Sequence, residues 1–337
     1  MLNEKLSQTL HGWVREKVVP GVSYAYLKAG QMQSEVFGYS QIFPAKEILQ
    51  PEMLYDLASL TKVVGTTTVI MHLVETKQVQ IDDPVAQYLP KFKDKRVTLR
   101  HLLTHTSALT GYIQNRDELS APDLLNALYT LEVGSWFEEK VVYADIGLIL
   151  LGQIIEAVYN QPVQTVIQEK VLTPLGMNTA TFTPSPALTV PTELSPKRGL
   201  IRGQVHDPKA FTLGRHCGSA GLFATLTDLV KFSQWFLTGK NYGPGPVPIS
   251  PTTIASLYQD WTPSGKLGRS LGWDLRVRID GRYALYHTGF TGTFLFLDQV
   301  SQEALIVLTN RIHPQSRNER FLLARDALIQ EFFVNSK

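Results

Sequence analysis

The chain has 337 residues, of which 44% are hydrophobic and 18% are charged. This composition is typical of a globular protein with a sizeable buried core, and it argues against a globally disordered chain. The formal net charge is only +2, and no block of lysine and arginine is interleaved with aromatic residues, so nucleic-acid binding is not expected. The length suits one large two-part unit or two ordinary domains.

The single cysteine, Cys217, excludes an internal disulfide framework and favours a reducing compartment. Residues 1–18 predict an amphipathic helix with Leu6, Leu10 and Trp13 on one face. This segment lacks the continuous apolar stretch and the small-residue cleavage site of a signal peptide. No run of eighteen apolar residues predicts a membrane span. We therefore expect a cytoplasmic protein that does not cross a membrane.

The next part of the chain predicts two strands and then mainly helices and loops. The strands, residues 22–27 and 31–39, flank a turn at Ala29-Gly30. Apolar periodicity predicts three helices, at Ser59 to Glu75, Asp145 to Tyr159, and Thr225 to Leu237 before Gly239. Proline and glycine mark long surface loops at residues 181–208 and 241–251.

The C-terminal part has the alternation of a half-buried sheet. Apolar residues recur at every second position from Trp273 to Ile279, and Asp280-Gly281 favours a tight hairpin. Three further strands are expected at Tyr283 to His287, Thr293 to Asp298 and Ala304 to Asn310. A final helix carries Phe321, Ala324, Leu328 and Phe332 on one stripe.

These elements predict a sheet that is built from both ends of the chain. Residues 1–58 and 265–337 would form the sheet lobe, and residues 59–264 would form an inserted, mainly helical lobe with long loops. A cleft between two such lobes is a usual place for a binding site.

Ser59-Leu60-Thr61-Lys62 is the only S-x-x-K segment in the sequence. Residues i and i+3 of a helix share a face, so the lysine amine can reach the serine hydroxyl. Free N–H groups in the first turn would point toward a bound substrate. A partly desolvated Lys62 would have a lowered pKa and would take the serine proton as a neutral amine. The alternative is a surface helix start with an ordinary solvated lysine.

Two further segments carry candidate chemistry. Tyr143-Ala144-Asp145 precedes an apolar helix, and a phenol there can act as a base beside a cation; alternatively, Asp145 is only an N-cap. His287-Thr288-Gly289 ends a strand, where glycine permits close approach of a substrate and the next N–H can complete an oxyanion hole. The alternative there is a glycine bulge.

In this order, the three segments resemble the S-x-x-K, Y-x-N and K-T-G motifs of penicillin-binding proteins and serine β-lactamases. The chain resembles the class C β-lactamase and DD-peptidase-like serine hydrolase family, and within it the esterase-like branch. Further resembling segments extend over nearly the whole chain: residues 102–107 (L-L-T-H-T-S), 143–152 (Y-A-D to L-G), 174–177 (P-L-G-M), 205–223 (V-H-D-P to A-G-L-F) and 287–292 (H-T-G-F-T-G).

The resemblance implies an α+β fold in which helices flank a five-stranded antiparallel sheet, with an inserted helical lobe. It implies Ser59 as the nucleophile, with proton transfer shared by Lys62 and Tyr143. The backbone N–H groups of Ser59 and Phe290 would form the oxyanion hole. The implied substrate-binding positions are Asp145, His287, Thr288 and Gly289. Neither a metal nor a cofactor is implied.

Two positions depart from the family pattern. Asp145 stands where an asparagine amide would donate to the substrate. His287 stands where β-lactamases usually have lysine, so a fixed positive charge is lost near neutral pH. β-Lactams and peptides present a carboxylate, which needs a cation or strong donors once it leaves water. Both departures therefore favour ester substrates.

Several other motifs are interpreted as structural. Gly268 to Gly272 fits G-x-S-x-G around Ser270, but the strand before it and the helix after it are missing, so it is read as a loop. His101 and His105 have zinc-helix spacing without the glutamate, and loop hydrogen bonds explain them better than a metal does. His206-Asp207 and His216-Cys217 are too isolated for a metal site, and Cys217 is read as a buried thiol.

Three functional hypotheses remain. The first is an esterase or related acyl hydrolase, and the second is a D-alanyl-D-alanine carboxypeptidase or β-lactamase. The third is a non-catalytic binding protein on the same scaffold, which the presence of Ser59, Lys62 and Tyr143 disfavours. The expected partner is a small-molecule ester, amide or β-lactam, and the oligomeric state is left open.

Overall fold

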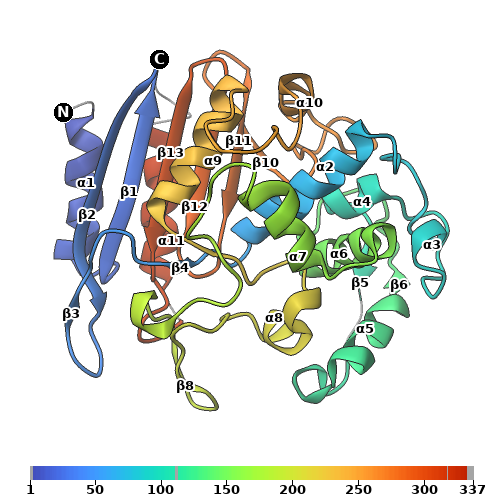
Figure 1. The fold of residues 1–337 in the computed structure, drawn as a ribbon, viewed down its shortest axis with the longest axis horizontal. Helices are drawn as coiled ribbons and strands as arrows, with labels where there is room; N and C mark the ends of the chain where they lie inside the picture. Colours follow the sequence, from blue (N-terminus) through green and yellow to red (C-terminus); the bar gives the residue numbers. More distant parts are fainter. Residues whose placement is uncertain (1–2, 111–112, 317, 332–337) are drawn as a thin grey trace.

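The computed structural model describes residues 3–110, 113–316 and 318–331. Its centre is an antiparallel sheet with the strand order β10-β11-β12-β13-β1-β2-β3 (Figure 1). The strands are β1 (Gly21–Lys28), β2 (Gln31–Gln41), β3 (Glu47–Ile48), β10 (Asp274–Val277), β11 (Tyr283–Thr288), β12 (Phe294–Asp298) and β13 (Glu303–Thr309). The two ends of the chain meet in the middle of the sheet, because β1 pairs with β13.

The predicted α+β class is confirmed, but the described sheet has seven strands and not five. Six of them correspond to the six segments predicted from the sequence. The seventh, β3, pairs with β2 through a register shift and has only two residues. A two-residue strand has no periodicity that a sequence can reveal. β10 is also shorter than predicted, because Arg278 and Arg282 already share a backbone hydrogen bond of the turn.

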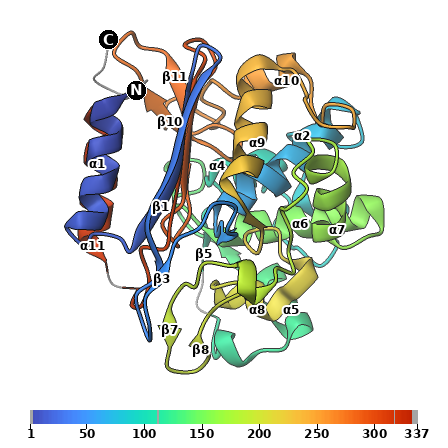
Figure 2. The same ribbon diagram turned by 60° about the vertical axis from the view of Figure 1, so that its left-hand side comes forward.

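The sheet is buried on both faces. Figure 2 shows α1 (Glu4–Arg15) and α11 (Glu319–Ile329) on one side of it and α9 (Leu226–Thr238) on the other. Because successive side chains of a strand point to opposite faces of the sheet, β12 contributes side chains to two hydrophobic cores. Phe294 and Phe296 pack with the core of α1 and α11, whereas Leu295 and Leu297 pack with the larger core on the other side.

The N-terminal helix ends earlier than the sequence suggested. The predicted helix over residues 1–18 is α1 (Glu4–Arg15), in which Asn3 is the N-cap and accepts from the Leu6 N–H. Its buried residues include Leu6, Leu10 and Trp13, as predicted. Met1 and Phe332 lie outside the described residues.

In the sequence, the segment between β3 and β10 is mainly helical. Its α- and π-helices are η1 (Lys62–Thr67), α2 (Thr68–Glu75), α3 (Val85–Tyr88), α4 (Leu99–Thr104), α5 (Ala121–Tyr129), α6 (Asp145–Tyr159), α7 (Val163–Ile167), η3 (Gln168–Leu172), α8 (Pro208–Leu213), α9 (Leu226–Thr238) and α10 (Pro251–Ser256). Short two-stranded sheets join β4 (Tyr55–Asp56) to β9 (Phe223–Ala224), β5 (Leu109–Thr110) to β6 (Glu132–Val133), and β7 (Leu194–Ser195) to β8 (Gly199–Leu200).

The predicted helix over residues 145–159 is present at these bounds as α6. The helix expected from Ser59 begins one residue later, at Leu60. Its first part, η1, is a π-helix, a form that often occurs at functional sites. α9 starts after Thr225, whose side chain caps it, and ends at Gly239 with φ 69°. Asp145 is the first residue of α6 and does not cap it; Ala144 is the N-cap.

In the described ranges, no single helix has the length and apolarity to cross a membrane. α6 and the α7–η3 segment meet that test only as a pair, bent by 79° at the break between them.

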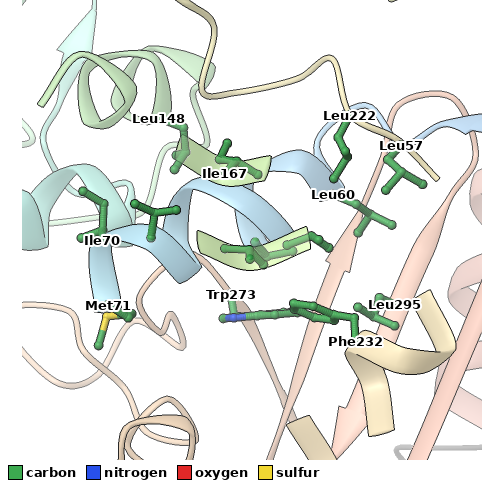
Figure 3. Close-up of a cluster of buried hydrophobic side chains, with 14 of the residues drawn as sticks. Leu57, Leu60, Ile70, Met71, Leu148, Ile167, Leu222, Phe232, Trp273 and Leu295 are labelled. Carbon is green, nitrogen blue, oxygen red and sulfur yellow. The ribbon is translucent and has the colours of Figure 1, made fainter. Parts of the chain in front are cut away.

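The start of the S-x-x-K helix is anchored in the larger core. Leu57, Leu60 and Leu222 are fully buried, and Figure 3 shows their side chains gathered near the sheet residue Leu295. The Leu57 N–H also donates to the Leu222 carbonyl oxygen at 3.0 Å. Packing and hydrogen bonding therefore fix the backbone on both sides of Ser59. The lobe boundaries at residues 58 and 265 stay a prediction.

Candidate active site

Ser59 lies in a tight turn between β4 and the helix that begins at Leu60. Ala58, directly before it, has a left-handed backbone with φ 45°. The buried Asp56 carboxylate holds this turn, because it accepts the Ala58 N–H at 2.8 Å. The same carboxylate accepts the His206 N–H at 2.7 Å. Asp56 thus ties the Ser59 turn to the loop that carries His206.

The H-T-G segment packs against the same turn from the sheet side. Thr293 Oγ1 donates to the Leu57 carbonyl oxygen at 3.1 Å, and Thr291 Oγ1 donates to the Asp56 carbonyl oxygen at 2.7 Å. A Cβ atom on Gly289 would lie 2.4 Å from the Leu57 carbonyl oxygen. Glycine is therefore required here for contact with the Ser59 turn, and its predicted role in the close approach of a substrate stays a prediction.

Lys62 lies behind Ser59 and is 1% exposed. Its ammonium donates to Ser59 Oγ at 2.6 Å and to the Ser219 carbonyl oxygen at 2.9 Å. It also forms an ion pair with Asp145 Oδ1 at 2.8 Å. A lysine ammonium has three N–H donors, so all three are used. The i, i+3 contact predicted between Ser59 and Lys62 is present.

The protonation state of Lys62 differs from the one expected. Burial lowers the pKa of Lys62, but the negative charges of Tyr143 and Asp145 outweigh it, and the pKa is raised above its ordinary value. The sequence suggested that desolvation alone would lower this pKa. That expectation was wrong because it placed no anion beside the lysine. Lys62 is an ammonium at neutral pH and not a free base.

Asp145 is held between two lysines. Its Oδ1 contacts Lys62, and its Oδ2 contacts Lys209 at 3.0 Å. Burial opposes ionisation, but the charges of the two lysines hold the pKa of Asp145 well below its usual range. Lys209 also pairs with Asp207 at 3.1 Å, and together these carboxylates raise its pKa despite burial. The negative charge of Asp145 is thus balanced within the site.

A cavity of about 290 Å³ opens at Ser59. Its lining residues are Ala58, Ser59, Tyr143, Asp145, His206, Asp207, Pro208, Ala220 and Phe290. Four predicted site residues, Ser59, Tyr143, Asp145 and Phe290, therefore meet in one place. Tyr143 is half-exposed there, and the Lys62 ammonium lies 5.4 Å from the centre of its ring.

The two N–H groups predicted for the oxyanion hole are available. Neither the Ser59 N–H nor the Phe290 N–H donates to another group in the described part of the chain. Phe290 is itself fixed: its carbonyl oxygen accepts from Arg311 Nε at 2.8 Å, and its ring stacks on His206 with centroids 5.4 Å apart. Two free donors at the rim of one cavity suit an oxyanion.

His287 and Thr288 do not line this cavity. His287 is 3% exposed, and its ring centre lies 6.1 Å from that of Tyr143. Burial, and then the charges of Arg269 and Lys62, lower the pKa of His287 well below its ordinary value. The imidazole is therefore neutral at neutral pH, as the sequence suggested, and its substrate-binding role stays a prediction.

Arg269 lies beside Tyr143 and was not predicted as a site residue from the sequence. Its guanidinium carbon lies 5.6 Å from the centre of the Tyr143 ring, and the residue is 8% exposed. Its nearest carboxylate, Asp274, is 3.9 Å away, and its Nε and Nη2 have no partner among the described residues. A buried, largely unpaired cation beside Tyr143 stabilises negative charge on the phenolic oxygen.

The motifs interpreted as structural take part in hydrogen bonds within the fold. Ser270 is fully buried in a loop and donates to the Leu257 carbonyl oxygen. His101 joins Thr98 to Glu138, and His105 Nδ1 accepts the Ala144 N–H at 3.3 Å.

Cys217 is buried, and His206 and His216 each pair with a glutamate. Cys217 is fully buried, and burial raises the pKa of its thiol. His206 pairs with Glu193, and His216 pairs with Glu156. Within residues 3–110, 113–316 and 318–331, no group of three or more His, Cys, Asp or Glu residues is arranged to hold a metal ion.

Comparison with known proteins identifies the family. The family model described as "Beta-lactamase" matches residues 6–329. The chain belongs to the β-lactamase family. Members of this family are serine hydrolases, so the chain is an enzyme, and the hypothesis of a non-catalytic binding protein is set aside.

Individual β-lactamase-family relatives differ in the activity that their names state. An Escherichia coli O157:H7 protein named "Putative D-alanyl-D-alanine carboxypeptidase" is 28% identical over 92% of this chain and 83% of its own length. The octameric penicillin-binding protein homologue from Pyrococcus abyssi has a TM-score of 0.76 at 22% identity, covering 98% of this chain and 78% of its own. EstCE1, "a hydrolase with promiscuous acyltransferase activity", has a TM-score of 0.74 at 19% identity, covering 96% and 97%. These two structures share the fold of this chain.

Proposed function

We propose that this enzyme hydrolyses small, uncharged carboxylic esters through an acyl-enzyme on Ser59. The observation that carries the proposal is the pairing of charges around the cavity. Both carboxylates of its lining have cationic partners and its histidine is paired: Asp145 pairs with Lys62 and Lys209, Asp207 with Lys209, and His206 with Glu193. A charged acyl group would lose its hydration there without gaining an unpaired opposite charge. A neutral acyl group is only weakly hydrated, so moving it from water into the cavity costs little free energy.

In the acylation step, Ser59 Oγ bonds to the acyl carbon and its proton passes to ionised Tyr143. Charge on the carbonyl oxygen is stabilised by the N–H groups of Ser59 and Phe290. The bond to the alcohol oxygen then breaks, and the alcohol leaves with the proton from Tyr143. The Lys62 ammonium stabilises negative charge on Ser59 Oγ and on the phenolic oxygen throughout.

In the deacylation step, a water molecule takes the place of the alcohol. Its oxygen bonds to the acyl carbon, and its proton passes to Tyr143. The bond from the acyl carbon to Ser59 Oγ breaks, and the serine oxygen recovers the proton. The products are the carboxylic acid and the free enzyme.

The test compares kcat/KM for p-nitrophenyl acetate and butyrate with kcat/KM for nitrocefin and a D-Ala-D-Ala peptide. We expect the esters to be turned over faster, and the Ser59→Ala variant to lose all of these activities. Faster turnover of nitrocefin or of the peptide by the unmodified enzyme would contradict the ester proposal.

A second candidate function is the removal of a terminal D-alanine from a peptide. Arg269 favours it, because a guanidinium binds a carboxylate through two parallel hydrogen bonds and Nε and Nη2 are unpartnered. The relative from Escherichia coli O157:H7 also carries the name of a D-alanyl-D-alanine carboxypeptidase, as a putative one. Release of D-alanine that falls far more than ester turnover in Arg269→Gln would support this function.

A further inference from the structure

We infer that a second cavity, which shares no lining residue with the one at Ser59, is a binding site for a carboxylate that carries an alkyl chain. This cavity, called the α1 cavity below, has a volume of about 450 Å³, which is within the range of ligand pockets. Its lining comes from the end of α1, from the end of β2 with the connection to β3, and from the residues around His313. The inference does not depend on the proposed ester hydrolysis.

One part of the lining of the α1 cavity is apolar. It consists of Val14, Val18, Val19, Pro20 and Ile42. Val18 and Val19 are buried, whereas Ile42 is 40% exposed. Covering apolar surface that borders water is favourable, roughly in proportion to the area that is covered. This part of the cavity therefore suits an alkyl chain.

The rest of the lining includes three cations and no carboxylate. The cations are Arg15, Lys17 and Lys46. In the described part of the chain, none of them takes part in an ion pair with a carboxylate. Glu47 directly follows Lys46, but it pairs with Arg202 at 2.8 Å. The positive charge at the cavity is therefore not balanced by the protein itself.

The end of α1 explains only part of this charge. A cation in the last turn of a helix is favourable, and Arg15 has this position in α1. Lys46 comes instead from the connection between β2 and β3, where its ammonium lies 5.1 Å from the centre of the Tyr39 ring. Tyr39 also lines the cavity. Cations from two separate elements thus border one apolar cavity, and an anionic group complements them.

Hydrogen bonds hold the lining in place before a ligand arrives. Asn318 Nδ2 donates to the Val18 carbonyl oxygen at 2.7 Å. His313 Nε2 accepts the Ile42 N–H at 3.1 Å, and its Nδ1 lies 2.9 Å from the Thr192 carbonyl oxygen. Burial lowers the pKa of His313, so its imidazole is neutral at neutral pH and fixes the wall without adding charge. A preformed site of this kind loses little freedom when it binds a ligand.

The two parts of the lining together select the ligand class. An inorganic anion would pair with the cations but would leave the apolar part in water. An uncharged alkyl compound would cover the apolar part but would leave the cations unpaired. A carboxylate with a chain of several carbons satisfies both. Each methylene that the cavity buries should tighten Kd by up to about fourfold.

The first test measures binding by calorimetry after Ser59 has been blocked with a fluorophosphonate probe. The block keeps ligands out of the cavity at Ser59, and intact mass spectrometry verifies it. The ligands are octanoate and octan-1-ol, which have the same number of carbons and differ in charge. Inorganic phosphate serves as a competitor that has charge but no chain.

Octanoate should bind to the blocked enzyme with one equivalent per chain. Its Kd should be about tenfold lower than that of octan-1-ol, because each exposed ion pair contributes up to about fivefold. Phosphate at the concentration of octanoate should not displace it. An equal Kd for octanoate and octan-1-ol, displacement by phosphate, or loss of octanoate binding when Ser59 is blocked would overturn the inference.

The second test locates the ligand with variants of the lining. Arg15→Gln/Lys46→Gln removes two of the cations, and Ile42→Ala shortens the apolar part. The matched control is Lys93→Gln/Lys95→Gln, which removes the same charge from outside the cavity. All five residues are exposed, so the substitutions leave the hydrophobic cores intact.

Arg15→Gln/Lys46→Gln should weaken the Kd of octanoate about fivefold or more and change that of octan-1-ol little. Ile42→Ala should weaken both by about twofold or more, and the control should change neither. An unchanged Kd of octanoate in Arg15→Gln/Lys46→Gln would place the ligand elsewhere and overturn the inference. If the probe does not label Ser59, the proposed acyl-enzyme fails, while the variants still decide this inference on the unlabelled enzyme.

Discussion

Lys62 and Asp145 form an ion pair of 2.8 Å directly behind the Ser59 hydroxyl. Breaking a buried pair of this kind leaves an uncompensated charge, which is strongly unfavourable. Lys62 therefore keeps its proton while Asp145 is ionised, and the group that takes the serine proton has to be found elsewhere. Tyr143 lines the same cavity and is flanked by two cations, Lys62 and Arg269. We assign the base to Tyr143 on these grounds.

The first prediction concerns the nucleophile. Ser59→Ala should lower ester turnover by several powers of ten, on the order of the loss seen when other serine hydrolases lose their nucleophile. Intact mass spectrometry after a fluorophosphonate probe should find one adduct in the wild type and none in the variant. An unchanged adduct in Ser59→Ala would disprove the assignment. Ser270 is not a substitute, because it is fully buried.

The second prediction is that Lys62 and Tyr143 act as one unit. Lys62→Ala removes the cation that stabilises the ionised phenol, and Tyr143→Phe removes the phenol itself. The double variant should therefore be little worse than the poorer single variant. When two residues serve the same step, removing either one already abolishes that step, and removing the second adds little. Rates of the three variants with p-nitrophenyl butyrate decide this. Fully additive losses in log kcat/KM would mean that the two residues work independently.

The third prediction concerns Arg269. Arg269→Gln removes a cation that lies 5.6 Å from the centre of the Tyr143 ring, so negative charge on the phenolic oxygen during proton transfer is less well stabilised. The value of kcat/KM for p-nitrophenyl butyrate at neutral pH should therefore fall. The matched control is Arg325→Gln on α11, on the opposite side of the sheet, which should leave kcat/KM unchanged. An unchanged kcat/KM in Arg269→Gln would count against a charge effect on Tyr143.

The fourth prediction links His287 to acid stability. Because its pKa is lowered in the folded protein, the unfolded chain binds a proton below about pH 6.5 that the folded chain does not. The free energy of unfolding therefore falls as pH decreases through this range, by up to about 1.4 kcal/mol per pH unit for this residue. His287→Gln removes this contribution to the slope.

Urea unfolding at pH 7.5 and pH 5 measures this effect. Lowering the pH from 7.5 to 5 should therefore destabilise His287→Gln less than it destabilises the wild type. If the difference between the two proteins is the same at both pH values, His287 carries its proton equally in the folded and unfolded states, and the prediction is wrong.

The sequence was sufficient to find the site residues that follow each other at fixed spacing. Ser59 and Lys62 are a helical turn apart, so their contact depends on local geometry alone. α6 could be predicted because its residues are apolar on nearly all sides. The sheet could be predicted because six of its strands are long enough to show alternation. β3, with two residues, could not.

Lys209 and Arg269 could not be predicted as site residues, because tertiary folding and not spacing from Ser59 brings each of them to Asp145 or Tyr143. Lys209 follows the V-H-D-P segment, and this position was the available signal. Arg269 directly precedes Ser270 in the G-x-S-x-G segment, for which the sequence favours a loop. The charge state of Lys62 was missed for the same reason, since it depends on anions from other elements. The cytoplasmic location stays a prediction.

The pairing of β1 with β13 has a consequence for how the enzyme is made. Val22 lies opposite Thr309, so β1 cannot pair with β13 until nearly the whole chain has been synthesised. Contacts between such distant segments form slowly and leave apolar strands exposed in the meantime. During synthesis, Ser59 and Lys62 leave the ribosome long before the strand that completes the sheet beneath them. Activity should therefore appear abruptly with the finished chain, and a chain that stops before residue 303 should have none.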